Sequence, residues 1–498
     1  MSPLVIIGFI ICYFLILLVM GYVTSRKASS SSYFLGNKSS PWIMVALGMI
    51  GDSLSGVTYI SVPGKVGTAH FSYLQIVLGY FVGYFIISHI LLPLYYRLNL
   101  TSIYEYLLSR FGKVTQKTGS LFFIISRLLG AGGRLYLAAS VIQFFVFDNL
   151  FEHHVPFALS VSLILFLMLL YTYKGGIKTL VYTDTIQSLF LVLGVVLSII
   201  AITSQMDISL FEATKRVCSS DMSESFFFDF KKSNFFFKDF IGGIFTAVAM
   251  TGLDQNMMQK NLSCRSLPEA QKNIFWFSIS MVVVTVFFLA LGVLLYMYYD
   301  FAHIALPINA ETGAVITDRV FPNLALNHLG AFSGLVFILG LTAATFSSAD
   351  SVLTTLTTSA YIDVLGIDQN NKLTEKKKTR YRTLIHVGFT VVLWLIILVF
   401  KELNKSALID TILIVASYTY GPLLALFMIG LFTKVNLRDK WVPLACVSGP
   451  IVCYLMSLNS KAIFGDYQIG LELIIMNAVI TGAILLLLKK PAIKKLGV

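Results

Sequence analysis

Hydrophobic residues along the chain form long runs that short polar stretches separate. A helix needs about 20 apolar residues to cross the hydrocarbon core of a bilayer. Thirteen runs approach or exceed that length, so the pattern predicts thirteen membrane-spanning helices. Their approximate limits are 3–24, 41–63, 72–96, 119–147, 157–173, 180–203, 237–258, 273–299, 330–362, 383–400, 407–432, 442–458 and 468–488.

The run over 41–63 carries a carboxylate among glycines. Asp52 lies between Gly48, Gly51 and Gly56, and each glycine in a helix costs about 1 kcal/mol relative to alanine. A break here would free backbone carbonyl groups to bind a cation, as discontinuous transporter helices do. Close packing against the glycines is the alternative, but the buried carboxylate favours the break.

A second interrupted run begins with Gly242-Gly243 and ends with Gly252 and Asp254. If spans two to six and seven to eleven are two five-helix repeats, the interrupted runs are the first members of each. That correspondence points to a binding site midway across the membrane. We expect an N-terminal helix within 1–30, repeats over 41–203 and 237–432, C-terminal helices within 442–498, and no separate soluble domain.

Hydroxyl groups cluster in the ninth run. Ala344, Ser347, Ser348 and Ser351 have the i, i+3, i+4, i+7 spacing of one helix face, and Asp350 borders that face. A carboxylate in hydrocarbon costs a few kcal/mol, so it is tolerated mainly inside a protein. Close helix packing would explain the small residues alone, whereas the carboxylate favours a bound cation such as sodium.

Other charged residues also fall within predicted spans. Asp184 lies about one turn into its span and could either cap the helix or bind a ligand. Asp254 lies near the inner end of its span, which favours a structural or gating role. Arg127 and Arg134 are seven residues apart and share a helix face. Arg134 could bind a carboxylate in bidentate fashion or neutralise an intramembrane aspartate, and both alternatives stay open.

Composition and charge agree with a polytopic membrane protein. The chain is 57% hydrophobic and 12% charged, whereas soluble domains are roughly 25% charged. If the N-terminus is outside, 25 of the 37 basic residues lie in inside loops, ten lie outside, and Arg127 and Arg134 lie within a span. This asymmetry obeys the positive-inside rule and supports an odd number of spans. The inside set includes Arg26, Lys27, Lys260, Lys494 and Lys495.

The cysteines and histidines indicate no other chemistry. The five cysteines have neither metal-ligand spacing nor the pattern of a disulfide framework, and the seven histidines show no paired spacing. The sequence therefore predicts no metal centre of that kind and no enzyme. The net charge of +12 is spread over short loops, so membrane topology explains it better than nucleic-acid binding.

Several motifs resemble those of the sodium/solute symporter family. They are Tyr33-Phe34-Leu35-Gly36 with Ser40-Pro41-Trp42, Ser55-Gly56-Val57-Thr58 with Pro63-Gly64, Gly175-Gly176 with Tyr182-Thr183-Asp184-Thr185-Ile186-Gln187, Asp254-Gln255 with Gln259-Lys260, and Ala344-Thr345-Phe346-Ser347-Ser348. The resemblance runs from about residue 5 to 450. It implies an all-α polytopic membrane protein with a leucine-transporter-like fold, in which one N-terminal and two C-terminal helices flank two inverted five-helix repeats.

The resemblance also implies sodium ligands. The main site would use the carbonyl groups of Gly51, Leu54 and Ala344 and the hydroxyl groups of Ser347 and Ser348. Some sialic-acid transporters of the family hold a second sodium ion, and the matching positions here are Asp184, Ser347, Asp350 and Ser351. Asp350 replaces a hydroxyl of that pattern. The group could therefore bind a second sodium ion, bind a proton, or be a purely structural pair of carboxylates, and all three alternatives stay open.

The function implied by the resemblance is sodium-coupled import of a small organic solute by alternating access. Candidate substrate residues are Ser53, Ser55, Thr58, Gln75, Arg134, Tyr136, Gln255 and Tyr418. A sialic acid, amino acid or monocarboxylate is favoured if Arg134 faces the pocket, and a neutral sugar or polyol becomes as plausible if Arg134 pairs with Asp52. A proton-coupled carrier on the same fold is a further alternative.

The expected partners are the solute, sodium ions and the lipid bilayer. Nucleic acid is not expected, and we expect a monomer to be functional. The first span has no positively charged segment before it, so it predicts a retained helix rather than a cleaved signal. We expect the chain in the cell (inner) membrane, with its N-terminus outside and its C-terminus in the cytoplasm.

Overall fold

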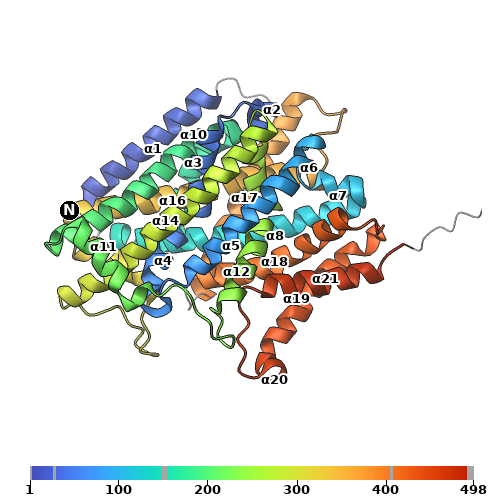
Figure 1. Ribbon diagram of the computed structural model, residues 1–498. Coiled ribbons are helices and arrows are strands. Elements are labelled where there is room, and N and C mark those ends of the chain that lie inside the picture. Colours follow the sequence, from blue (N-terminus) through green and yellow to red (C-terminus); the bar gives the residue numbers. More distant parts are fainter. Residues whose placement is uncertain (1–2, 26–29, 149–154, 404–407, 491–498) are drawn as a thin grey trace, which may run out of the picture.

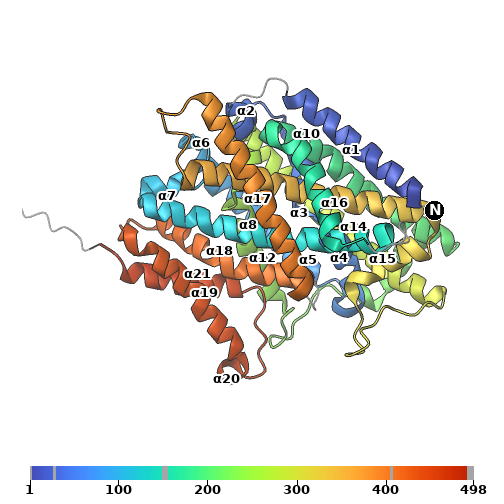
Figure 2. The ribbon, with the colours of Figure 1, turned by 180° about the vertical axis from the view of Figure 1, so that it is seen from behind.

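The computed structural model describes residues 3–25, 30–148, 155–403 and 408–490. Within these ranges the chain is a bundle of helices, and its only β-pairings are three isolated bridges. The first and last helices lie on opposite sides of the bundle, as Figure 1 and the reverse view in Figure 2 both show. The basic residues Arg26, Lys27, Lys494 and Lys495 lie outside the described residues.

The helices vary widely in length, and several are single turns or broken halves. They are α1 (Pro3–Ser25), α2 (Ser30–Leu35), α3 (Trp42–Ser53), α4 (Gly56–Ala69), α5 (Tyr73–Ile86), α6 (Leu92–Arg97), α7 (Glu105–Arg110), α8 (Lys113–Ile142), α10 (Phe157–Gln205), α11 (Leu210–Ser219), α12 (Phe236–Ala247), α13 (Gln255–Leu262), α14 (Leu267–Phe301), α15 (Thr317–Asn327), α16 (Gly330–Ser359), α17 (Glu375–Leu403), α18 (Leu408–Phe432), α19 (Val442–Leu458), α20 (Ser460–Phe464) and α21 (Leu473–Leu487).

The structure confirms a multi-pass membrane protein. In the described part of the chain, nine helices are long and apolar enough to cross a membrane, and counting each of two bent pairs as one span gives eleven. Two shorter apolar helices, Phe157–Thr172 and Leu473–Leu487, coincide with two further predicted spans. The count of thirteen is reached only if both of these also cross, so it stays a prediction.

Both predicted helix breaks are present. The helices α3 and α4 form one bent pair with an angle of 59°, and the break falls at Leu54 and Ser55. The second pair consists of α12, continued by a π-helical turn over Val248–Gly252, and α13, with an angle of 63°. Each break follows a polar or glycine-rich segment, which agrees with the low helix propensity of those residues.

The predicted spans 157–173 and 180–203 meet at a kink rather than a loop. Together they make up α10, which consists of two helices joined at Gly176, where the backbone angles are non-helical (φ 59°, ψ −153°). A Cβ atom at this position would lie 2.4 Å from the carbonyl oxygen of Tyr33. Both the positive φ and the close approach therefore require glycine here.

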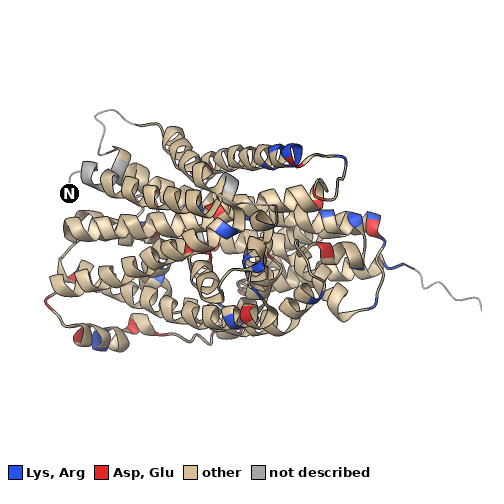
Figure 3. Cartoon of the chain, turned by 90° about the horizontal axis from the view of Figure 1, so that it is seen from above, with Lys and Arg blue, Asp and Glu red and all other residues tan. Residues whose placement is uncertain are grey.

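Charged side chains are distributed unevenly along the bundle. Figure 3 shows Lys and Arg gathered at the end of the bundle away from the N-terminus, as the loop charges predict. The assignment of Lys260 to an inside loop is wrong, because this residue belongs to α13 and its side chain is 1% exposed. The charged side chain of Lys260 is tolerated in the interior because two buried carboxylates, those of Asp52 and Asp184, contact its ammonium group.

The kink in α10 gives a stability prediction. Gly176→Ala should lower the free energy of unfolding by about 1–2 kcal/mol or more, because alanine is strained at positive φ and its Cβ would collide with the backbone of Tyr33. The measurement is thermal unfolding of the purified protein in detergent. The control is Gly388→Ala on α17, where no atom lies within 4 Å of the added Cβ. Equal melting temperatures for the two variants would contradict the prediction.

Candidate functional site

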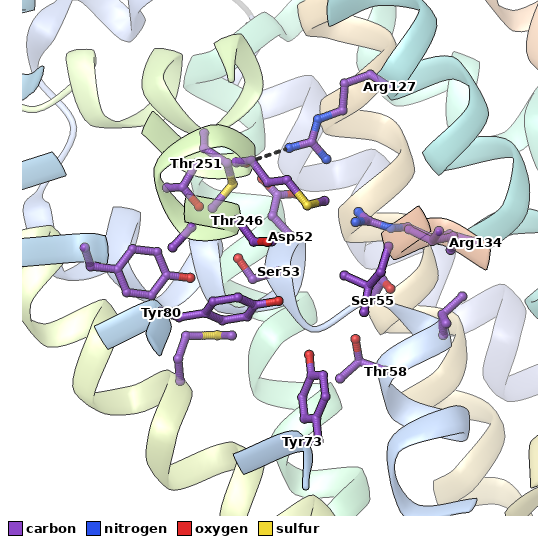
Figure 4. A pocket seen from close by; sticks show the side chains of 18 residues that line it. Asp52, Ser53, Ser55, Thr58, Tyr73, Tyr80, Arg127, Arg134, Thr246 and Thr251 are labelled. Carbon is purple, nitrogen blue, oxygen red and sulfur yellow. Dashed lines mark hydrogen bonds between the residues drawn. The ribbon is translucent and has the colours of Figure 1, made fainter. Parts of the chain in front are cut away.

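A cavity lies at the two helix breaks, in the middle of the bundle. Its volume is about 90 Å³. Its wall comes from the α3–α4 break, α5, α8, α12 with its π-turn, α13, α14 and α18 (Figure 4). The lining includes methionine and aliphatic side chains as well as a larger polar set. This polar set consists of Asp52, Ser53, Ser55, Thr58, Tyr73, Tyr80, Tyr84, Arg127, Arg134, Thr246 and Thr251.

Four of the sequence-predicted substrate residues lie in this wall. Ser53 and Ser55 flank the end of α3, Thr58 lies in the first turn of α4, and Arg134 reaches in from α8 (Figure 4). The break places the two serines here because it turns the chain at Leu54. The predicted residues in the cavity wall therefore combine three hydroxyl groups with one arginine, Arg134.

Four other predicted substrate residues lie outside the wall, and the expectation for them does not hold in this structure. They are Gln75, Tyr136, Gln255 and Tyr418. The side chain of Gln75 binds the loop before α12, at the backbone of Phe227 and Asn234, and also binds Asp239. Gln255 binds the backbone of the turn before α7. Tyr136 packs on Phe157, and the hydroxyl of Tyr418 donates to Ser457.

The two arginines on α8 have different surroundings. Arg127 Nε donates to Asp254 Oδ2 at 2.5 Å, and the hydroxyl of Tyr420 donates to the same oxygen. Arg134 is only 9% exposed, yet within the described ranges it has no hydrogen-bond or ion-pair partner. Figure 4 shows its guanidinium directed into the cavity. The alternative that Arg134 pairs with Asp52 is thus not the arrangement found.

Asp52 pairs with Lys260 instead. The ammonium group of Lys260 contacts Asp52 Oδ2 and lies 2.5 Å from Asp184 Oδ2, and all three side chains are buried. Asn256 Nδ2 also donates to Asp52 Oδ2, at 3.2 Å. Two carboxylates and one ammonium carry a net charge of −1. Lys260 could have been found from the sequence by asking which cation neutralises the intramembrane aspartates.

The residues of the predicted main sodium site lie beside the cavity. A Cβ atom on Gly51 would lie 2.6 Å from Ser347 Oγ, so α3 and α16 are in close contact here. Ser347 Oγ is buried and has no partner among the described residues. Leu54 ends α3, and in the described chain the carbonyl groups of Gly51 and Leu54 accept no hydrogen bond. Such free oxygens suit a sodium ion.

Ala344 and Ser348 complete that group on α16. Both are buried, and Ser348 Oγ donates to the carbonyl of Thr345 at 3.0 Å, which leaves its lone pairs available. A carbonyl group within a helix keeps a second lone pair, so that of Ala344 can also contact a cation. The five predicted ligands thus have free acceptor capacity.

Of the predicted second cation group, Asp184 and Ser351 are in direct contact. Ser351 Oγ donates to Asp184 Oδ2 at 3.0 Å. Asp350 accepts the hydroxyl of Tyr171 at 2.9 Å and the N–H of Ser351 at 2.5 Å. Asp184 lies inside α10 rather than at a helix start, so the capping interpretation is wrong. Its Oδ1 atom has no partner among the described residues, whereas its Oδ2 atom is already bound by Lys260.

Comparisons with known proteins identify the family. The sequence profile of the sodium:solute symporter family matches residues 33–438. The chain is 26% identical over 420 residues to the sodium/sialic acid symporter NanT of Aliivibrio fischeri, covering 83% of this chain and 80% of the relative. It is also 26% identical over 434 residues to the sodium/sialic acid symporter SiaT of Proteus mirabilis, with coverage of 84% and 82%.

A solved structure shows the same fold. It is the substrate-bound outward-open state of a Na+-coupled sialic acid symporter, and it matches with a TM-score of 0.80 at 21% identity, covering 97% of each chain. The predicted leucine-transporter-like fold is therefore confirmed. With the profile match over most of its length, the chain belongs to the sodium:solute symporter family.

Proposed function

We propose that this protein imports a small carboxylate-bearing solute together with sodium, by alternating access. The observation that carries the proposal is Arg134, a buried arginine that has no partner in the described part of the chain and points into a cavity beside the predicted sodium ligands. As a member of a family of sodium-coupled transporters, the protein is not an enzyme. Sodium is cargo here, and it moves with the solute.

The shared chain segment at the α3–α4 break supports coupling between sodium and solute. Gly51 and Leu54 belong to the predicted sodium site, while Ser53 and Ser55 between and after them line the cavity. A sodium ion that fixes the break against α16 would also fix these serines for the solute. Coupling is then a difference in affinity between two conformations. A membrane potential adds about 2.3 kcal/mol per charge per 100 mV.

Arg134 supports a solute with a carboxylate. A buried charge without a counter-charge is costly, and the planar guanidinium binds a carboxylate through two parallel hydrogen bonds. The relatives NanT and SiaT are sodium/sialic acid symporters, and sialic acid carries a carboxylate. A neutral sugar or polyol was the alternative if Arg134 paired with Asp52. Asp52 pairs with Lys260 instead, so this alternative is not favoured.

Binding of one sodium ion is better supported than binding of two. Lys260 already supplies a positive charge at Asp184, so a second sodium ion there would meet electrostatic repulsion. Asp350 lies two residues from Ser348 on α16, and a sodium ion at the main site would balance its charge. We therefore propose that Asp184 and Asp350 set the negative charge around the main sodium site without binding a second sodium ion. Ser351 donates a hydrogen bond to Asp184.

The topology completes the proposal. We place the N-terminus outside and the C-terminus in the cytoplasm, because Lys and Arg gather at the end away from the N-terminus (Figure 3). The host is the cell (inner) membrane. That a monomer is functional stays a prediction.

The first test is uptake into proteoliposomes. An inward sodium gradient should drive accumulation of a radiolabelled carboxylate solute, and replacing sodium with choline should abolish it, because choline is too large for the oxygen ligands. Parallel vesicles carry a pH gradient in choline. Uptake that persists in choline and collapses with the pH gradient would establish proton coupling instead.

A second prediction concerns the sodium ligands. Ser347→Ala should weaken sodium affinity about tenfold, since losing one oxygen contact to a charge costs on the order of 1.5 kcal/mol. The measurement is the sodium concentration that gives half-maximal thermal stabilisation. Ser448→Ala on the exposed face of α19 is the control, because its hydroxyl contacts only the backbone of Leu444. Unchanged sodium affinity in Ser347→Ala would defeat the site assignment.

A third prediction concerns the solute. Arg134→Gln should reduce solute affinity by about 30-fold or more, because removing one partner of a buried charge pair costs at least 2 kcal/mol. Stabilisation by sodium should remain. The control is Arg216→Gln, whose guanidinium pairs with Glu212 on an exposed helix. If solute affinity survives in Arg134→Gln, the carboxylate subsite is elsewhere.

A further inference from the structure

Asp52 presents an unused carboxylate oxygen at the cavity wall. Its Oδ2 atom is bound by Lys260 and Asn256. Its Oδ1 atom is buried and, in the described ranges, has no hydrogen-bond partner. Ionised carboxylates accept several hydrogen bonds and donate none. The cavity therefore has one strong acceptor for a donor group of the solute, in addition to Arg134.

The charges around the cavity also call for a cation. With both carboxylates ionised, Asp52, Asp184 and Lys260 have a formal charge of −1, while Arg134 has a charge of +1 and no partner among the described residues. Charges in a low-dielectric interior are tolerated when they are compensated. A solute anion compensates Arg134 alone and leaves the triad of Asp52, Asp184 and Lys260 with its negative charge. A solute with both signs compensates both groups.

Three aromatic rings of α5 line the same cavity. Tyr73, Tyr80 and Tyr84 all line the cavity, and their spacing of seven and four residues places them on one face of α5. Figure 4 shows Tyr80 next to Ser53 and Asp52, with Arg134 entering from the opposite side. The face of an aromatic ring attracts an ammonium group within about 6 Å. The two ends of the cavity thus differ in the charge that they favour.

We propose that the solute is a zwitterion, whose ammonium group binds Asp52 beside Tyr80 and whose carboxylate binds Arg134. This inference rests on the proposed function and narrows its substrate class. Ser53 lies beside Asp52 and Ser55 lies on the side of Arg134 (Figure 4), so both line the cavity where the body of the solute binds. A carboxylate without an amine leaves the Asp52 Oδ1 atom without a donor and binds more weakly.

The experiment is a binding screen on the purified protein in saturating sodium chloride, read by thermal shift and calorimetry. The zwitterions are the twenty proteinogenic amino acids, glycine betaine, β-alanine and γ-aminobutyrate. Each zwitterion that binds is compared with its matched acid without the amine, such as propionate for alanine, and N-acetylneuraminate represents amine-free carboxylates. We expect at least one zwitterion to bind at least about tenfold more tightly than its matched acid.

Two outcomes of this screen overturn the proposal. One is that no zwitterion binds, and the other is that the matched acids or N-acetylneuraminate bind as tightly as every zwitterion. In either case, sodium-dependent binding of an amine-free carboxylate that is lost in Arg134→Gln leaves the proposed function intact. Zwitterion binding that needs no sodium supports the inference but overturns the proposed function.

The variant Asp52→Asn tests the anchor itself. It should lower the affinity ratio between a zwitterion and its matched acid by at least about tenfold, because the charge is removed and the shape is kept. An unchanged ratio overturns the proposal. Because Asp52 also binds Lys260, a second pair covers the case in which this variant does not fold. Tyr80→Leu should lower the ratio, whereas Tyr80→Phe keeps the ring and should leave it unchanged; equal ratios in both overturn the proposal.

Discussion

Polar and charged groups inside a bilayer must find their partners within the protein, because no water is present to solvate them. Most of the buried charges here satisfy that constraint directly. Arg127 binds Asp254, and Lys260 binds both Asp52 and Asp184. Among the described residues, Asp52 Oδ1, Ser347 Oγ and the guanidinium of Arg134 have no hydrogen-bond partner, and all three lie at or beside the first helix break. The free groups and the paired ones together define where ligands can bind.

The Lys260 side chain connects parts of the fold that are far apart in sequence. It starts from α13, the second half of one broken helix, and contacts Asp52 at the end of α3, the first half of the other. Its second contact, Asp184, belongs to α10. A movement of either broken helix therefore changes the surroundings of this ammonium group. That arrangement gives a physical route by which the two breaks move together.

The sequence predicts much of the architecture because hydrophobic length and glycine content are local properties. Both broken helices could be predicted from carboxylates and glycines within apolar runs, around Asp52 and Asp254. The side-chain environment depends on which face a helix presents, which one sequence does not determine. Gln75 and Gln255 therefore bind loops rather than the cavity. Lys260 was missed because it follows the end of an apolar run, where a basic residue is ordinarily a loop charge.

Lys260 also has a consequence for the return half of the transport cycle. When the cargo has dissociated into the cytosol, a pair of bare carboxylates would attract potassium, the abundant intracellular cation, and could carry it outward. A positive charge that is covalently attached cannot dissociate with the cargo, so Asp52 and Asp184 keep a counter-ion throughout. Under the proposed orientation, this fixed charge would lower the tendency of the empty carrier to bind potassium and carry it outward.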